Sequence, residues 1–126
     1  MWLEFRRVLF RSLKIDIEGN EYKILNSIIK NRNKLLMLII EFHHIQSNKK
    51  KLLFFFKKLL KDLFIIHLHG NNNSSINVDG IPDVLEVTLI KKNTKIISKK
   101  RIYSFPTKYD FPNNPNFKDL NFRFNY

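Results

Sequence analysis

The feature that most constrains the fold is the stretch at residues 13–22, which predicts a strand that delivers acidic groups to a tight turn and a helix. Ile15 and Ile17 are β-branched and favour a strand over residues 13–17, packed on its faces. Asp16 and Glu18 alternate with them. A fully buried strand tolerates such charges only at its carboxyl end, so we place both acids there.

The turn after this strand has its own signals. Gly19 can adopt a backbone conformation closed to other residues. Asn20 is a good helix N-cap, and Glu21 then falls in the first helical turn, where a carboxylate is favoured. We expect Glu21 to be a helix-end charge rather than a ligand contact. Because open α/β sheets bind ligands at the carboxyl ends of their strands, Asp16 and Glu18 are candidates for polar chemistry.

The next elements alternate between helix and strand. Residues 20–31 have apolar side chains at helical spacing, and residues 35–42 form a near-continuous apolar run typical of a central parallel strand covered on both faces. A second helix is predicted over residues 46–62, with a solvated lysine face, and a third strand over residues 64–69. The predicted buried stripe of the second helix is Leu52, Leu53, Phe56, Leu59, Leu60 and Leu63.

The last third of the chain predicts a polar loop and further strands. Residues 70–80 are rich in Asn and Ser, and residues 84–91 predict a strand with alternate residues on one side. Residues 95–103 and 120–124 predict two more strands, joined by a Pro/Asn-rich irregular arm. The fold class is therefore α/β, a mostly parallel sheet with right-handed crossovers and an antiparallel hairpin at the end.

Five ordered blocks resemble one enzyme family. Lys-Ile-Asp-Ile-Glu-Gly-Asn-Glu-Tyr, ending at Tyr22, is similar to the signature of FkbM-type S-adenosylmethionine-dependent methyltransferases. The blocks at residues 39–43, 67–72, 82–88 and 109–115 match in the same order. The resemblance implies the C-terminal half of a Rossmann-like methyltransferase sheet. It also implies methyl transfer from S-adenosylmethionine, most simply to a hydroxyl oxygen of a sugar or another small polar acceptor.

The resemblance and the strand ends together give the candidate site. Asp16 and Glu18 would lie at the edge of the pocket for the methyl donor and acceptor, with Asp16 also contacting the cofactor. Glu41 and His43, at the carboxyl end of the second strand, complete the candidate catalytic set. A carboxylate there can take the acceptor's proton or hold the acceptor in place.

A second group of polar residues would bind the acceptor. We expect His69, Asn71 and Asn72 to border the same pocket as Glu41 and His43. Glu41 and His43 share one face at a strand end, so with Asp16 on the neighbouring strand they could form a divalent metal site. The ligand spacing matches no established metal motif, however, so we expect no metal. His67 and His69 should share one face of their strand, because they are two residues apart.

Composition limits the remaining possibilities. The chain has no cysteine, which excludes disulfides and thiolate metal sites and fits a cytoplasmic protein. No apolar run is long enough to span a membrane, and only three glycines are present, none spaced for a glycine-rich cofactor turn. The net charge of +12 comes with abundant Lys, Asn, Ile and Phe, which A/T-rich codons alone would produce, so a nucleic-acid partner is not our first expectation.

Residues 1–12 differ from the rest, because they contain three arginines but no lysine or asparagine. They resemble a translated sequencing adapter, and we expect residues 13–126 to be a partial methyltransferase domain that is inactive without a cofactor-binding half. Two alternatives stay open. One is a small basic α/β module that binds nucleic acid through its lysine-rich helix, with affinity that falls steeply with salt. The other is a fragment without activity. The oligomeric state is left open.

Overall fold

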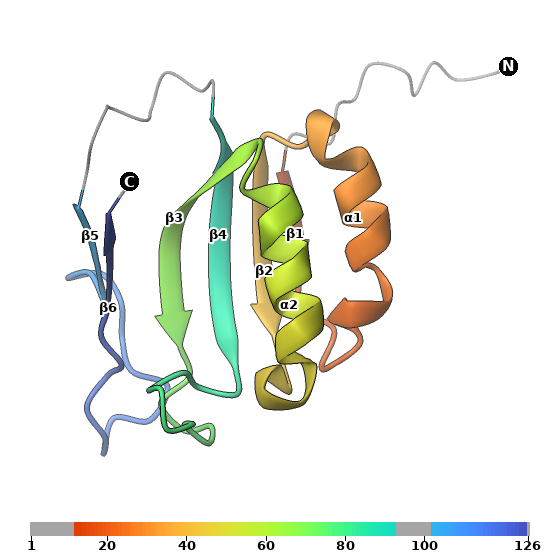
Figure 1. The fold of residues 1–126 in the computed structure, drawn as a ribbon. Coiled ribbons are helices and arrows are strands. Elements are labelled where there is room, and N and C mark those ends of the chain that lie inside the picture. Colours follow the sequence, from red (N-terminus) through yellow and green to blue (C-terminus); the bar gives the residue numbers. More distant parts are fainter. Residues whose placement is uncertain (1–11, 93–101, 126) are drawn as a thin grey trace, which may run out of the picture.

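A computed structural model describes residues 12–92 and 102–125 of the chain (Figure 1). Most of the strand predicted at residues 95–103, and all of residues 1–12 except Ser12, lie outside the described part. The strands are β1 (Ser12–Ile15), β2 (Met37–Phe42), β3 (Leu63–Gly70), β4 (Leu85–Lys91), β5 (Ile102–Phe105) and β6 (Phe122–Asn125). The helices are α1 (Leu25–Asn31) and α2 (Ile45–Leu59), with short 3-10 turns η2 (Glu21–Lys23) and η3 (Arg32–Lys34) on either side of α1.

The main sheet has the strand order β1-β2-β4-β3. Only β1 and β2 pair in parallel, whereas β4 pairs antiparallel with both β2 and β3. The α/β class and the antiparallel hairpin of β3 with β4 are confirmed, but the expectation of mostly parallel pairing is not. The reason is topological: β4 returns from β3 into the gap between β2 and β3, so it separates two strands that run in the same direction.

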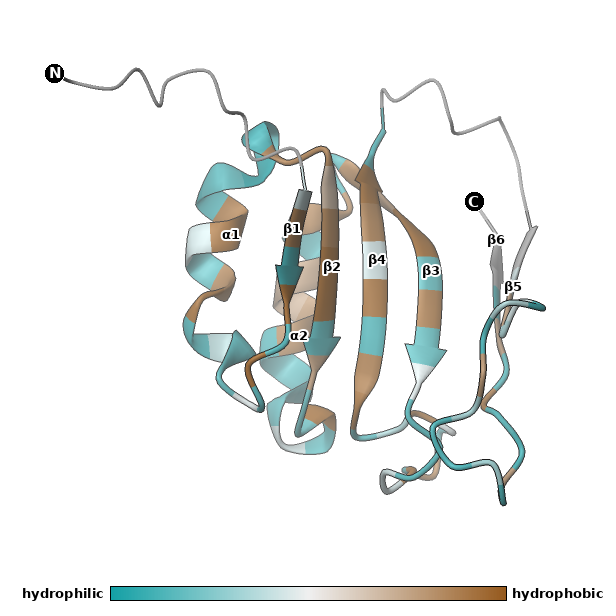
Figure 2. Cartoon of the chain, turned by 180° about the vertical axis from the view of Figure 1, so that it is seen from behind, coloured by the Kyte–Doolittle hydropathy of each residue, from teal (hydrophilic) through white to brown (hydrophobic). Residues whose placement is uncertain are grey.

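Both helices pack on one face of this sheet (Figure 1). The other face, turned to the viewer in Figure 2, has no described helix on it. Burial along β2 therefore alternates, with Leu38, Ile40 and Phe42 fully buried and the residues between them only partly covered. The prediction that this strand is covered on both faces is wrong, because α1 and α2 lie on the same side.

The aromatic core lies between β2 and α2. Phe42 contacts Phe55 and Phe56 edge-on, with ring centroids 5.8 Å apart in each case. Phe55 is fully buried although the predicted stripe omitted it, and Leu53, which the stripe included, is 62% exposed. The predicted buried face is therefore rotated about the helix axis relative to the observed one. Apolar residues occupy every position from 52 to 56, so the 3.6-residue period alone does not show which of them face the sheet.

The C-terminal part forms a separate small hairpin beside β3. β5 pairs antiparallel with β6, which confirms a strand near the predicted position at residues 120–124. Residues 106–121 form the irregular connection between them. Within the described residues, neither helix is long and apolar enough to cross a membrane.

Candidate active site at the strand ends

The parallel pairing of β1 and β2 brings two acidic residues together. Ile15 pairs with Ile40, so the next residues, Asp16 and Glu41, occupy neighbouring positions at the carboxyl ends of the two strands. Lys14 and Ile39 lie two positions earlier in the two strands, so Asp16 and Glu41 share their face of the sheet. No described helix covers this face. The prediction that both strands deliver carboxylates to one edge is confirmed by this register.

The turn after β1 positions Glu18. Glu18 and Gly19 have positive φ angles of 52° and 95°. A Cβ at Gly19 would lie 3.0 Å from the His44 ring, so both the backbone angle and the space favour glycine. The strand ends earlier than predicted, because Ile17 is 39% exposed and already belongs to the turn.

Glu21, rather than Asn20, holds this turn in place. The Asn20 side chain makes no capping bond and donates to the Ile17 carbonyl instead. Oε1 of Glu21 accepts hydrogen bonds from the backbone N–H groups of Gly19, at 3.0 Å, and of Ile17, at 3.3 Å. Glu21 lies in the first turn of η2, as predicted, but its side chain is fully buried and turned into the protein.

His43 connects the turn to β2. Its Nδ1 lies 3.0 Å from Oε1 of Glu21, which fixes the orientation of the ring. Its Nε2 points to two other carboxylates, at 3.2 Å from Oε1 of Glu41 and 3.5 Å from Oε2 of Glu18. Three predicted site residues therefore meet, and Glu21 is the fourth member that the sequence argument assigned to another role.

The carboxylates of this cluster differ in their pKa. Burial alone would raise the pKa of Glu21, but hydrogen bonds from the backbone N–H groups of Gly19 and Glu21 and from His43 lower it below its ordinary value. Burial raises the pKa of Glu41, and the negative charges of Asp16, Glu86 and Glu18 raise it further, although His43 opposes them. Glu41 therefore takes up a proton more readily than Glu21.

Chemically, the arrangement offers several oxygen donors and one imidazole nitrogen. One ligand atom each from Asp16, Glu41 and His43 lie within 4.8 Å of one another. Such a group can accept a proton, hold a hydroxyl group, or surround a cation. Asp16 is exposed and the other two are half-buried, so the cluster is accessible from solvent.

The predicted acceptor-binding residues lie elsewhere on the sheet. His69 opposes Glu86, which in turn opposes Glu41, so β4 separates His69 from Glu41 by roughly 10 Å. His69 instead pairs with Asp119, at 3.4 Å, and His67 with Asp110, at 2.9 Å. The two rings are stacked with centroids 6.4 Å apart, which confirms that they share one face.

The asparagines after β3 bind the C-terminal segment. The Asn72 side-chain amide donates to the Asn114 carbonyl and lies near two more, and its oxygen accepts from the Asn114 N–H at 2.8 Å. Asn71 organises its own loop, because its side chain accepts from the N–H of Asn73. The structure thus joins Asn72 to residues 114–118 rather than to Glu41 and His43, and a role in acceptor binding stays a prediction.

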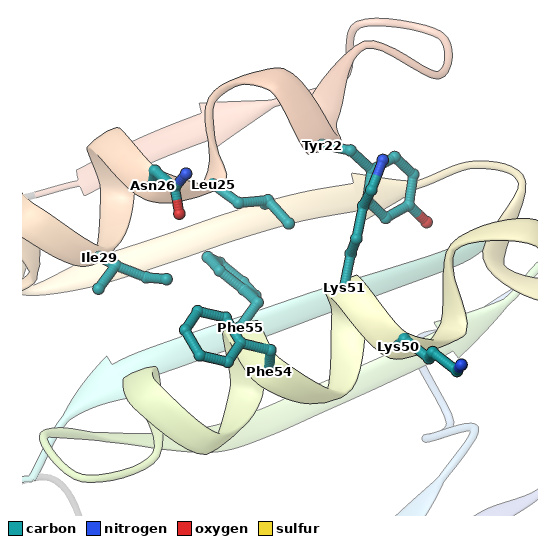
Figure 3. Close-up of a pocket in the computed structure, with 8 residues that line it drawn as sticks. All are labelled: Tyr22, Leu25, Asn26, Ile29, Lys50, Lys51, Phe54 and Phe55. Carbon is teal, nitrogen blue, oxygen red and sulfur yellow. The ribbon is translucent and has the colours of Figure 1, made fainter.

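A separate groove lies between the two helices (Figure 3). It has a volume of about 390 Å³, and its mostly apolar walls come from η2, α1 and α2. Figure 3 shows Leu25 and Ile29 facing Phe54 and Phe55, with Lys51 across one end. These walls carry no carboxylate or histidine, so the groove is not the location of the acidic cluster. The lining residues are Tyr22, Leu25, Asn26, Ile29, Lys50, Lys51, Phe54 and Phe55.

One signal in the sequence pointed to Glu21. The first block of the family resemblance contains two glutamates around its glycine, and the second of them is Glu21. Helix-end statistics explain an acid at that position equally well, so they could not reveal that the side chain turns inward. The pairing with His43 depends on β2 lying next to β1, which local sequence does not show.

Comparison with known proteins supports the same family. The family model of the methyltransferase FkbM domain matches residues 3–71, which is more than half of the chain. This part contains Asp16, Glu18, Glu21, Glu41 and His43. No curated protein and no solved structure matches the chain. The chain therefore belongs to the FkbM methyltransferase domain family.

Proposed function

We propose that this chain is part of an S-adenosylmethionine-dependent O-methyltransferase that acts on a sugar or another small polar acceptor. The observation that supports the proposal is the gathering of Asp16, Glu18, Glu41 and His43 at the carboxyl ends of two parallel strands, inside the family match. Open α/β sheets bind their ligands at this edge.

The donor set suits a cationic methyl donor. S-adenosylmethionine supplies an activated methyl group on a positively charged sulfur. Asp16 is an exposed carboxylate in a cluster with Glu18 and Glu41, so the local charge favours a cation at this edge. The sequence lacks a glycine-rich turn of the kind that holds such a cofactor, so we propose that this turn is supplied outside the 126 residues.

Glu41 is the proposed general base. Its pKa is raised, so at neutral pH it is a stronger base than an ordinary glutamate. S-adenosylmethionine would supply the methyl group and leave as its neutral thioether when the acceptor oxygen bonds to the methyl carbon. Glu41 would take the proton that the acceptor hydroxyl loses in this step. His43, held by Glu21, would orient Glu41 through the 3.2 Å contact.

The test uses the proposed longer protein that would contain this chain, with cofactor binding measured by calorimetry and turnover measured by release of the demethylated cofactor over a panel of sugars. We expect the wild-type protein to bind the cofactor. The Glu41→Gln variant should also bind the cofactor, but its turnover should be about 100-fold slower. Asp79→Asn is the matched control, because Asp79 is exposed and pairs only with Lys49 among the described residues. An intact protein that binds no cofactor would refute the assignment.

A further inference from the structure

The balance of charge in the strand-end cluster needs an explanation. Eleven acidic residues are present in a chain with a net charge of +12, and five of them gather here. Among the described residues no lysine or arginine forms an ion pair with any of the five, and His43 is their only basic partner. The five are Asp16, Glu18, Glu21, Glu41 and Glu86.

His43 alone does not neutralise this group. Its Nδ1 is used by Glu21, which leaves one ring nitrogen for both Glu18 and Glu41. Glu86 also lies directly opposite Glu41 in the antiparallel pair, and like charges in that position destabilise a sheet. Burial is the first cause of the raised pKa of Glu41, and the crowded charges of Asp16, Glu86 and Glu18 add to it.

The orientation of His43 has the form found in metal sites. A histidine that ligates a metal through one nitrogen usually donates its other N–H to a carboxylate, which fixes the tautomer and the ring. Glu21 makes this bond to Nδ1, and it is fully buried with its second oxygen, Oε2, unpartnered among the described residues. Nε2 thereby faces the carboxylates of Glu41 and Glu18.

The distances also suit a shared ion. Two ligand atoms on neighbouring corners of a metal site, each about 2.1 Å from the ion, lie about 3 Å apart. Nε2 of His43 is 3.2 Å from Oε1 of Glu41 and 3.5 Å from Oε2 of Glu18. Ligand atoms of Asp16, Glu41 and His43 fit within 4.8 Å. The ligand spacing in the sequence matches no metal motif, because the three ligands come from two strands. Glu41 lies in β2, His43 follows β2, and Asp16 follows β1.

We propose that Asp16, Glu41 and His43 bind a divalent metal cation, with Glu18 beside them and Glu21 positioning His43. One imidazole nitrogen and several carboxylate oxygens suit an ion that accepts both donor types, such as Mn²⁺ or Zn²⁺, better than the all-oxygen preference of Ca²⁺. If the proposed function holds, this ion would also ligate the acceptor hydroxyl and lower its pKa, and Glu41 would then act as a ligand of the ion rather than as the free general base.

The experiment titrates Mn²⁺ into the 126-residue chain, with free Mn²⁺ followed by electron paramagnetic resonance. We expect one ion per chain with a dissociation constant on the order of 10 µM. Asp16→Asn, at an exposed position, and Glu41→Gln should each weaken binding at least about 10-fold. Asp110→Asn is the matched control, because it also removes a carboxylate that pairs with a histidine, and it should not change the affinity.

A second measurement locates the ion. Bound Mn²⁺ should broaden the ring resonances of His43 before those of His67 and His69, which provide an internal control on β3. No binding up to about 1 mM, or binding equal in the wild type and both cluster variants, would overturn the proposal. Because these measurements use neither cofactor nor acceptor, their failure would leave the proposed methyl transfer standing, and absence of cofactor binding would leave the ion site standing.

Discussion

Two histidine groups lie on the same face of the sheet and differ in their balance of charge. His43 contacts three carboxylates, those of Glu18, Glu21 and Glu41. His67 and His69 contact one carboxylate each, Asp110 and Asp119. The first group therefore has acid in excess, whereas the second is paired one to one.

The two groups also connect different parts of the chain. The carboxylates of His67 and His69 come from residues more than 40 positions away, and each pair attaches the C-terminal segment to β3. Burial alone would raise the pKa of Asp110, but bonds from Thr107 and His67 lower it, as for a stabilising ion pair. The His43 group instead joins the ends of neighbouring strands and contains a carboxylate of raised pKa. The comparison teaches that a surplus of carboxylates, rather than the presence of histidine, distinguishes the proposed site from the ion pairs of His67 and His69.

The largest effect is expected at Glu21. Glu21→Ala leaves the N–H groups of Ile17 and Gly19 and the ring of His43 without their acceptor, so it should lower the free energy of unfolding by about 3 kcal/mol in urea titrations. Because the pKa of Glu21 is lowered, its contribution is present above pH 4.5 and is lost as the pH falls through the folded-state pKa.

Glu21→Gln provides the control for this prediction. The amide oxygen can still accept from the turn, so the loss should be smaller, about 1 kcal/mol, and Mn²⁺ binding should weaken because the bond to His43 loses its charge. Equal stability of Glu21→Ala and the wild type would show that Glu21 does not hold the turn.

An intermediate effect on stability is expected at Asn72, which follows β3 and bonds the same C-terminal segment as His67 and His69. Asn72→Ala removes the amide that bonds Asn114 and its neighbours, and should cost roughly 2 kcal/mol and speed proteolysis within residues 106–121. Asn73→Ala is the control, because its bond to Asn114 is exposed and its loss should have little effect. Mn²⁺ affinity should be unchanged in both variants, and a loss at Asn72 would mean that the two groups are coupled.

The sequence was sufficient to predict most of the helices and strands, but not which strands lie next to one another in the sheet. The position of Asp16 and Glu41 near the carboxyl ends of two strands followed from alternation and apolar runs, which are local properties. The position of β4 between β2 and β3 depends on long-range pairing, and it moved His69 away from His43. The inward turn of Glu21 was hidden for the same reason, since an acid in a first helical turn is favourable whether or not a histidine faces it.

The smallest effect is expected at Glu41, and its sign is opposite to that at Glu21. The raised pKa of Glu41 means that the folded state binds the proton more tightly than the unfolded state, so ionisation lowers stability as the pH rises from 4.5 through the folded-state pKa. Glu41→Gln should therefore stabilise the metal-free chain at pH 7 by roughly 0.5 kcal/mol and have no such benefit below about pH 4. Urea titrations at the two pH values, with Asp79→Asn as control, measure the difference. A destabilised variant at pH 7 would mean that Glu41 forms a favourable ion pair with His43, and the charge surplus that separates the two histidine groups would then be absent.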